Sequence, residues 1–276
     1  MKMPSVLVTG AGRGIGLAIT EHMSSRGWDV YATARSDAAL HSLNRLPHVH
    51  PIPLDITDRS DIAALPARLP AGLNGLVNNA GIIVNGPVEG LSLDDLTDQL
   101  DVNVISQIAV TQAVLPKIRE AGGRLVFMSS VSGLITTPGT GAYNASKYAI
   151  ESLADALRME LRPWKIPVSL IEPGPIRTDM WGSALDDYDR MTEQLSEAHR
   201  RLYASHLAGS RKLMGRMQKL AADPKRVTKA VNHALTSRHP KRRYLLDTLS
   251  RAQKLTFAVT PAAISDAILA AATTSK

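Results

Sequence analysis

The sequence of 276 residues contains no cysteine, only two phenylalanines and no long apolar run. Without thiols the chain forms neither disulfides nor thiolate metal sites, and we expect it in a reducing compartment, the cytoplasm. No apolar stretch approaches the ~18 residues of a membrane-spanning helix. The first four residues lead directly into an apolar stretch and do not resemble a secretory signal. His41, His48 and His50 lie in loop-like sequence, so we expect no metal site.

The chain does contain an alternation of short apolar stretches and longer amphipathic stretches. The short ones predict buried parallel strands at residues 5–9, 30–33, 49–53, 75–78, 124–129 and 168–172. The longer ones predict helices at residues 17–26, 38–46, 60–69, 93–103, 105–120 and 143–161. Together they predict an α/β fold, a Rossmann-type doubly wound parallel sheet, in a single domain spanning residues 1–276. Ligands bind such sheets at the carboxyl ends of the strands.

A glycine-rich turn joins the first predicted strand to the first predicted helix. It reads Gly10-Ala11-Gly12-Arg13-Gly14-Ile15-Gly16. Glycines let the backbone approach phosphates, whose charge is met by the free N–H groups at the start of the helix. Between a strand and a helix the turn predicts a dinucleotide-binding site, although its glycine spacing differs from the commonest G-x-G-x-x-G fingerprint. The alternative is a tight structural turn without a ligand.

Tyr143 and Lys147 lie four residues apart at the start of a predicted helix, so their side chains point the same way. A phenol normally titrates near pH ~10. A neighbouring cation favours the phenolate and lowers that pKa, which lets the oxygen pass a proton to or from a substrate. We therefore expect acid–base chemistry from this pair. The spacing alone leaves open a pair on the helix surface without any chemistry.

With further motifs in the same order, these residues resemble the short-chain dehydrogenase/reductase superfamily in its compact single-domain branch. The resemblance covers residues 5–180. Its motifs are Thr9–Gly16, Asn78–Gly81, Asn103, Ser130, Tyr143 with Lys147, and Pro173-Gly174 followed by Thr178. A narrower and less specific resemblance, in residues 146–158 and 171–174, is to members that act on steroids, retinoids and hydroxybutyrate.

The resemblance implies four catalytic residues, which are Asn103, Ser130, Tyr143 and Lys147. Tyr143 exchanges the proton, and Lys147 supports it and holds the nicotinamide ribose. Ser130 orients the substrate oxygen and steadies developing charge, with Ser132 as the substitute in a shifted alignment. Asn103 kinks its helix and positions a water behind the lysine, although it could instead be an ordinary polar residue at a helix boundary.

The resemblance also implies residues that surround a dinucleotide. The pyrophosphate meets the glycine turn, and Asp55 meets the adenine amino group. Asp55 has the alternative of a simple turn or cap residue. The full set of cofactor-binding residues is Gly10, Gly12, Arg13, Gly14, Ile15, Gly16, Arg35, Asp55, Ile56, Asn79, Ala80, Gly81, Tyr143, Lys147, Pro173, Gly174, Ile176 and Thr178.

The choice between NAD and NADP depends on the residue after the second strand. Relatives that prefer NAD carry an acid there to hold the ribose 2′-hydroxyl, whereas this chain has Ala34 followed by Arg35. Arg35 and Arg13 suit a 2′-phosphate, because guanidinium groups pair well with phosphate. We therefore expect NADP(H) rather than NAD. Two solvated arginines are the competing interpretation, and the nearby Asp37 favours NAD.

The C-terminal third is rich in positive charge. Residues 200–254 contain 15 Lys or Arg against two Asp, whereas the whole chain has a net charge of +7. Three interpretations stay open: a solvated helical surface, an interfacial helix at anionic lipid, and a contact to an acidic substrate or carrier. A peripheral membrane contact is thus one expectation for this region. No nucleic-acid-reading motif accompanies the charge, so we expect no nucleic-acid partner.

Two helical segments complete the predicted domain, a lid at residues 180–220 and a C-terminal extension at residues 247–276. The tail is apolar but interrupted by Pro261 and Asp266, so it predicts a docked helix and not a membrane span. Spaced apolar residues in the lid either line a substrate pocket or form the packed face of a helix. These residues are Trp181, Leu185, Tyr188, Met191 and Leu195.

The activity expected from the resemblance is that of an NADP(H)-dependent alcohol dehydrogenase or carbonyl reductase acting on a hydrophobic secondary alcohol or its ketone. A non-enzymatic NADP(H)-binding sensor and an epimerase or dehydratase on the same scaffold are the alternatives. The presence of Tyr143 and Lys147 argues against the sensor, and the short chain argues against the epimerase. The resemblance also implies a homodimer or homotetramer paired through residues 105–120 and 143–161.

Overall fold

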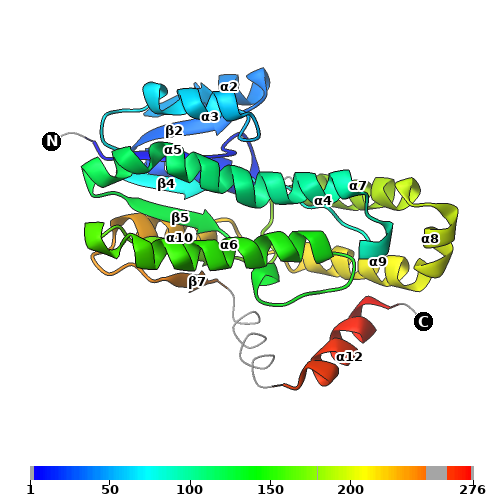
Figure 1. The fold of residues 1–276 in the computed structure, drawn as a ribbon. Coiled ribbons are helices and arrows are strands. Elements are labelled where there is room, and N and C mark those ends of the chain that lie inside the picture. Colours follow the sequence, from blue (N-terminus) through cyan, green and yellow to red (C-terminus); the bar gives the residue numbers. More distant parts are fainter. Residues whose placement is uncertain (1–2, 179, 247–259, 275–276) are drawn as a thin grey trace.

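In the computed structural model, which describes residues 3–178, 180–246 and 260–274, the chain forms a seven-stranded sheet with helices on both faces (Figure 1). The strands are β1 (Ser5–Val8), β2 (Asp29–Ala34), β3 (Val49–Pro53), β4 (Gly75–Asn78), β5 (Arg124–Met128), β6 (Val168–Glu172) and β7 (Arg243–Leu245). They are all parallel, in the order β3-β2-β1-β4-β5-β6-β7. The order reverses between β1 and β4, and ligands bind at such a switch point. The predicted doubly wound sheet is confirmed.

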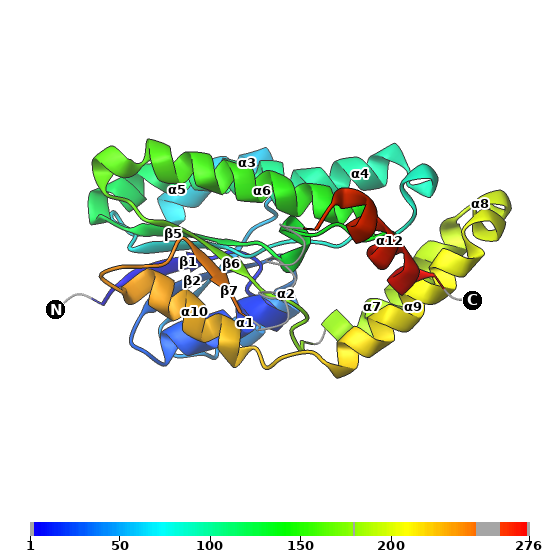
Figure 2. The same cartoon turned by 90° about the horizontal axis from the view of Figure 1, so that it is seen from below.

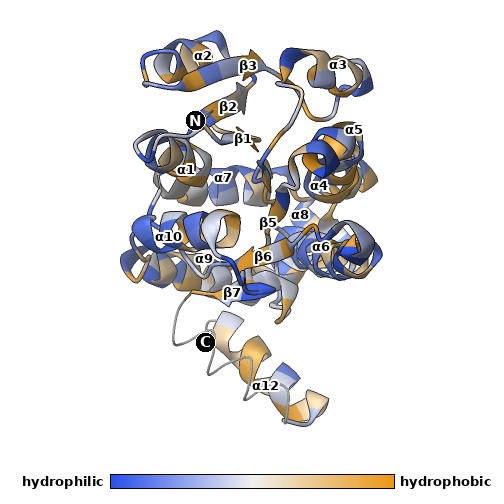
Figure 3. Ribbon diagram, turned by 90° about the vertical axis from the view of Figure 1, so that its left-hand side faces the viewer, coloured by the Kyte–Doolittle hydropathy of each residue, from blue (hydrophilic) through white to orange (hydrophobic). Residues whose placement is uncertain are grey.

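Helices connect the strands and cover the sheet. They are α1 (Gly14–Ser24), α2 (Asp37–Leu43), α3 (Arg59–Ala64), α4 (Leu93–Leu100), α5 (Ser106–Ala121), α6 (Gly141–Glu160), α7 (Met180–Gln194), α8 (Glu197–Leu202), α9 (Ala204–Lys219), α10 (Lys225–Thr236) and α12 (Ala262–Thr273). Short 3₁₀ turns lie at η1 (Leu65–Arg68), η2 (Val88–Gly90), η4 (Val131–Gly133) and η5 (Arg162–Trp164), and a π turn lies at η3 (Asp101–Ile105). Figure 3 shows α1 and α10 on one face of the sheet and α3, α5 and α6 on the other.

Alternate side chains of the strands build two cores. In β1, Val6 and Val8 enter the core beneath α1 and α10, and Leu7 enters the core beneath α5 and α6. This follows from the period of two in a strand, which sends successive side chains to opposite faces. Each fully buried aliphatic side chain contributes about 2 kcal/mol from apolar burial. The two cores hold the carboxyl ends of the strands in place, where the motif residues lie.

The structure differs from the sequence prediction in two elements. The helix predicted at residues 93–103 ends at Leu100, and the chain continues through the π turn η3 into α5. The basic C-terminal region was expected to be helical, but residues 243–245 form β7 at the edge of the sheet. A strand of three residues is too short to show a period, so only the tertiary pairing with β6 reveals it.

The segment α7–α9 projects beyond the carboxyl ends of the strands, and α12 packs against α9 (Figure 2). A methyl group at Gly209 of α9 would collide with the backbone of Thr273 and Thr274, so the two helices touch closely here. The predicted C-terminal extension is described only from residue 260 onward, because residues 247–259 lie outside the described residues. In the described part of the chain, no helix has both the length and the apolar character needed to cross a bilayer. The single-domain boundaries and the lid stay predictions.

Candidate active site

The glycine turn between β1 and α1 has a backbone that only glycine adopts readily. Gly10 and Gly14 have φ angles of 64° and 57°, in the left-handed region. A methyl group at Gly10 would lie 2.8 Å from the Ala80 Cα atom, and one at Gly16 would collide with the Gly10 carbonyl oxygen. The turn therefore folds closely against the residues that follow β4, and its backbone stays accessible at the switch point of the sheet.

Hydrogen bonds join this turn to the end of β4. The Thr9 hydroxyl oxygen accepts from the amides of Asn79 and Ala80, at 2.9 and 3.1 Å. The Asn79 side-chain amide donates to the carbonyl oxygens of Thr9 and Gly10, at 2.9 and 3.2 Å. Asn79 and Ala80 were predicted to flank the cofactor, and the structure places them beside the turn. Thr9 is part of the glycine-turn motif in the sequence, and its contacts show that it also braces the turn against the end of β4.

The loop after β6 brings Thr178 to the same place. The Thr178 Cβ atom would lie 3.6 Å from a methyl group on Gly14. Its hydroxyl oxygen is buried and has no hydrogen-bond partner among the described residues. Pro175 and Arg177 anchor the loop through backbone hydrogen bonds with Ala222. A buried hydroxyl without a partner, beside an open glycine turn, fits a polar group of a bound ligand such as the nicotinamide carboxamide.

Three predicted catalytic residues converge between β5 and α6. Ser130 follows β5, and Tyr143 and Lys147 lie one turn apart on α6. The Ser130 hydroxyl lies near enough to the Tyr143 phenol to lower its pKa, and it caps η4 by accepting from the Ser132 amide at 3.1 Å. The Lys147 ammonium lies 5.5 Å from the centre of the Tyr143 ring and donates to the Met128 carbonyl oxygen at 2.8 Å. Ser132, the substitute considered from the sequence, supplies only its backbone to this cluster.

Burial governs the protonation of this cluster. It raises the pKa of the Tyr143 phenol, and the nearby Ser130 hydroxyl partly opposes that rise. Burial also lowers the pKa of Lys147 to about 8. The sequence led us to expect a lowered phenol pKa beside Lys147, whereas in this structure burial outweighs other effects and the pKa of Tyr143 is raised. The phenol is therefore protonated at neutral pH, which is the form that donates a proton.

Asn103 lies in the π turn η3 and is fully buried. Its side-chain oxygen accepts from the Ile82 amide at 2.9 Å, and its amide group donates to the Ile82 carbonyl oxygen and to the Ser146 hydroxyl, at 3.0 and 3.1 Å. Asn103 thus ties the loop after Gly81 to helix α6. Both of its amide hydrogens are used by protein groups, and the predicted role in positioning a water stays a prediction.

The residues predicted to choose the cofactor lie at the carboxyl end of β2. A methyl group at Gly12 would lie 2.8 Å from Ala39 and 3.3 Å from Ala34, so the turn packs against the start of α2. The Arg35 side chain is 73% exposed and lies 3.8 Å from Asp55. Arg13 is also exposed, and it begins α1 without a side-chain cap. Both guanidinium groups are therefore accessible beside the turn.

Asp55 makes the hydrogen bonds of a turn residue, which the sequence offered as the alternative to adenine binding. Its carboxylate accepts from the backbone amide and the hydroxyl of Thr57, at 2.9 and 2.8 Å. The hydrogen bond from the Thr57 backbone amide is the largest cause that lowers the pKa of Asp55 below its usual value, and the Thr57 hydroxyl adds to it, although partial burial opposes both. Ile56 packs its side chain into the core beneath α5 and α6. A contact of either residue with the cofactor stays a prediction.

The apolar residues of the predicted lid pack together. Tyr188, Leu195 and Leu207 form a small core, and the Tyr188 hydroxyl donates to the Leu207 carbonyl oxygen at 3.1 Å. Met191 packs against this core, so two of the five residues, Tyr188 and Met191, form the packed face of α7, as one of the two interpretations expected, and Leu195 joins them from just beyond the end of that helix. Leu185 is partly buried, and the side chain of Trp181 lies outside the described residues.

The described residues hold no cluster of His, Cys, Asp or Glu suited to a metal ion.

The sequence profile of the short chain dehydrogenase family matches residues 4–189. The uncharacterized oxidoreductase YbbO of Escherichia coli (strain K12) is 35% identical over 269 residues, which cover 96% of this chain and 93% of the relative. Retinol dehydrogenase 5 of Homo sapiens is 32% identical over 279 residues, covering 96% and 87%.

A solved structure of a short-chain dehydrogenase from Streptomyces avermitilis superimposes with a TM-score of 0.77 at 28% identity, covering 94% of this chain and 93% of that one. The match of sequence and fold thus extends over nearly the whole chain, well beyond the motifs. It confirms the resemblance inferred from those motifs. The chain belongs to the short-chain dehydrogenase family and is an oxidoreductase that acts on CH–OH groups with NAD or NADP.

Proposed function

We propose that this protein is an NADP(H)-dependent oxidoreductase that interconverts a hydrophobic secondary alcohol and its ketone. The observation that carries the proposal is the convergence of Ser130, Tyr143 and Lys147, in which Ser130 lowers the pKa of the buried phenol and Lys147 lies beside its ring on α6. These residues follow β5 in the chain. The neighbouring strand β6 leads to the loop of Thr178, and β1, on the far side of β4, leads to the glycine turn. Acid–base groups and a dinucleotide-binding turn at the carboxyl ends of the same parallel strands suit hydride transfer with proton exchange.

The glycine turn, the Asn79–Gly81 segment and the Thr178 hydroxyl would hold the cofactor. Bound there, its nicotinamide ring supplies the hydride to the substrate carbon or accepts it. The remaining chemistry belongs to the side chains. The Tyr143 phenol, which burial keeps protonated, gives its proton to the carbonyl oxygen during reduction. The Ser130 hydroxyl hydrogen-bonds the same oxygen and stabilises the charge that develops on it.

Ala34 and Arg35, at the carboxyl end of β2, support NADP(H) over NAD. Ala34 ends β2 where an acid would be needed for the ribose 2′-hydroxyl, and it offers no carboxylate. Arg35 follows it with an exposed guanidinium that is held only by an ion pair at 3.8 Å. Such a loose surface pair costs little to rearrange around a 2′-phosphate.

The apolar character of the substrate is inferred from the surroundings and from the relatives. The segment α7–α9 lies beyond the strand ends and has its own apolar core. Retinol dehydrogenase 5 is named for a hydrophobic alcohol. An assay panel should therefore contain apolar secondary alcohols and ketones together with retinol, a primary alcohol.

The substitution Tyr143→Phe tests the proposal. Turnover of the best substrate in the panel, followed by NADPH absorbance, should fall by about 10²- to 10⁴-fold, because the phenolic proton is lost. The Kd for NADPH should change less than about twofold, since the ring remains. Tyr148→Phe, on the exposed side of the same helix, is the matched control and should retain full activity. Full turnover in Tyr143→Phe would refute the proposed acid–base role and leave a different chemistry, whereas NADPH binding without turnover of any panel substrate by the wild type would favour the sensor.

We also propose that the protein forms an oligomer and that it contacts membranes. The oligomer is a homodimer or homotetramer formed through α5 and α6, and the outer face of α6 exposes the apolar side chains of Tyr148, Leu153 and Met159. The membrane contact is peripheral and is made with anionic membranes through α9 and α12, which combine exposed cations with exposed isoleucines. The cytoplasmic location stays a prediction.

A further inference from the structure

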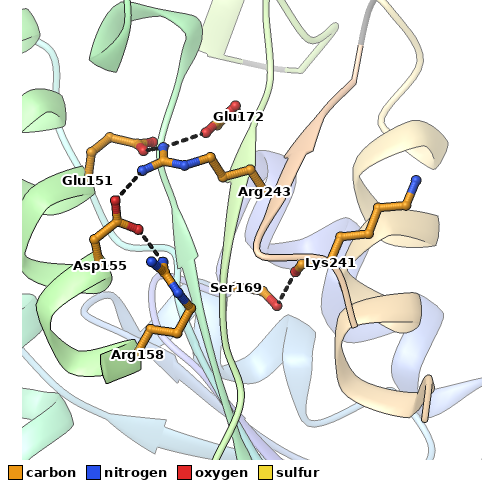
Figure 4. A network of polar contacts seen from close by, with 7 residues as sticks. All are labelled: Glu151, Asp155, Arg158, Ser169, Glu172, Lys241 and Arg243. Atoms are coloured by element: carbon orange, nitrogen blue, oxygen red, sulfur yellow. Dashed lines mark hydrogen bonds and ion pairs between the residues drawn. The ribbon is translucent and has the colours of Figure 1, made fainter. Parts of the chain in front are cut away.

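Arg243 of β7 lies among three carboxylates from two neighbouring elements (Figure 4). Its guanidinium pairs with Glu151 and with Asp155 on α6, the latter at 2.6 Å. It also pairs with Glu172, the last residue of β6, at 2.9 Å. The side chains of Glu151 and Glu172 are only 7% and 0% exposed. Within the described part of the chain, Arg158 pairs with the more exposed Asp155 and with no other acid.

Glu151 is adjacent to the catalytic part of α6. It follows Lys147 by one helical turn, so both side chains lie on the same side of the helix. It also packs beneath η4, because a methyl group at Gly133 would lie 3.0 Å from the Glu151 Cγ atom and 3.0 Å from the Lys147 carbonyl oxygen. A displacement of Glu151 is therefore transmitted both to Lys147 and to the turn that follows Ser130.

Glu172 is adjacent to the loop that leads to Thr178. It directly precedes Pro173, whose carbonyl oxygen accepts from the Val131 amide at 3.1 Å and from the Ser130 hydroxyl at 3.5 Å. The Glu172 carbonyl oxygen in turn accepts from the amide of Leu246, just after β7. The end of β6 thus connects Arg243 both to Ser130 and to the loop that leads to Thr178.

Buried carboxylates of like charge need a cation between them, because burial and mutual repulsion both disfavour the ionised state. Among the described residues, Arg243 is the cation that contacts both Glu151 and Glu172. It comes from a strand that carries no proposed catalytic or cofactor-binding residue.

We propose that Arg243 is a positioning residue of the active site: by neutralising Glu151 and Glu172 it fixes α6 relative to the end of β6. The distance between the Tyr143–Lys147 pair and the loop of Thr178 then depends on this cation. The inference rests on the proposed function, because it assigns a role in holding the site around the dinucleotide.

The charges around the two buried carboxylates give the proposal a pH signature. On α6, Lys147 and Asp155 lie one turn to either side of Glu151, and Arg158 contacts Asp155; on β7, Arg243 contacts both buried carboxylates. When Arg243 is replaced by Gln, the pKa of each buried carboxyl rises, so both are neutral at low pH and ionise as the pH increases. The defect in Arg243→Gln should therefore be small at pH 5.5 and grow toward pH 7.5. This range lies below the pKa of about 8 of Lys147.

The experiment measures the Kd of NADPH and of NADH, by fluorescence titration between pH 5.5 and pH 7.5. We expect Arg243→Gln to weaken binding about tenfold at pH 7.5 and less than about threefold at pH 5.5, because small displacements in a preorganised site are costly. Arg243→Lys should retain most of the affinity. The double variant Arg243→Gln/Glu151→Gln should recover much of it, since one buried charge is removed with the cation.

Arg158→Gln is the matched control, because it removes the arginine that pairs with the more exposed Asp155, and its Kd should match the wild type. A wild-type Kd in Arg243→Gln, or a defect that is equal at every pH, would overturn the positioning role. Should Arg243→Gln fail to fold, a folded double variant supports the neutralisation and an unfolded one refutes it.

Hydrogen exchange without nucleotide separates this inference from the proposed function. In Arg243→Gln, the protection factors of residues 129–147 and 172–178 should fall as the pH rises, and in the wild type they should not. A wild type that binds neither nucleotide would defeat the proposed function, whereas the exchange result would still decide the role of Arg243. Unchanged protection in Arg243→Gln would refute the inference alone.

Discussion

At the scale of single residues, burial decides the chemistry of the site more than neighbouring charge does. Tyr143 and Lys147 are close enough to interact, yet burial raises the pKa of the phenol and lowers that of the amine to about 8. A protonated phenol is ready to donate, and an amine with a pKa near 8 loses its charge within the range of ordinary assays. Thr178 adds a hydroxyl that has no hydrogen-bond partner among the described residues and lies beside the glycine turn.

Arg35 carries the first prediction at this scale. Arg35→Asp should weaken NADPH binding at least about tenfold, because a charge-assisted hydrogen bond to the 2′-phosphate is replaced by repulsion. NADH binding should become the stronger of the two, because the new carboxylate accepts from the ribose hydroxyl. Steady-state kinetics with both cofactors check it. Arg45→Asp, on the exposed surface just after α2, is the charge-matched control, and an unchanged NADPH to NADH ratio in Arg35→Asp would contradict the assignment.

At the scale of elements, helix α6 joins two roles on opposite faces. Its inner face buries Lys147, Ile150 and Ala154 against the sheet. Its outer face exposes Tyr148 and Met159, which are eleven residues apart and therefore three turns apart on one side of the helix. An apolar outer face on the helix that carries the catalytic pair is suited to pairing with another copy of the chain.

We predict that two copies of the chain pair through the outer face of α6. The wild type should be a dimer or tetramer by size-exclusion chromatography with light scattering. Met159→Asp should shift it toward the monomer, because a buried carboxylate at the interface lacks a partner. Leu202→Asp, at an equally exposed position on α8, should leave the mass unchanged. A monomeric wild type, or a Met159→Asp variant of wild-type mass, would contradict pairing through α6.

At the scale of the whole molecule, the positive charge is distributed unevenly. Lys212, Arg216 and Lys219 are exposed along one side of α9, and no ion pair joins them to an acid among the described residues. Ile264 and Ile268 are exposed on α12, which packs against α9 and stands apart from the sheet (Figure 3). Cations beside exposed aliphatic side chains are typical of surfaces that lie on anionic lipid.

The corresponding prediction is that the protein sediments with vesicles containing phosphatidylserine and does not sediment with pure phosphatidylcholine vesicles. Each of Lys212→Gln and Arg216→Gln should reduce binding by about fivefold, because a cation near an anionic surface contributes about 1 kcal/mol. Salt should weaken the interaction in the same direction. Arg45→Gln, remote from α9, is the control. Equal binding to both kinds of vesicle would show that the cations are only a solvated surface.

The sequence by itself determined the parts of this protein that depend on local spacing. The alternation of apolar stretches predicted the parallel sheet, because strand and helix periods are written in consecutive residues. The glycine turn and the Tyr143–Lys147 pair were found in the same way, since a turn and a helical step need only a few neighbouring positions. The family assignment followed from these motifs and was confirmed by the comparisons.

Tertiary structure decided what depends on residues far apart in the chain. It placed Thr178 beside Gly14, sent Tyr188 and Met191 into a core of their own, and set Arg243 between two buried carboxylates. It also reversed the expected direction of the phenol pKa. Burial and long-range pairing arise only when the whole sheet and its helices are packed, so no local pattern of residues records them.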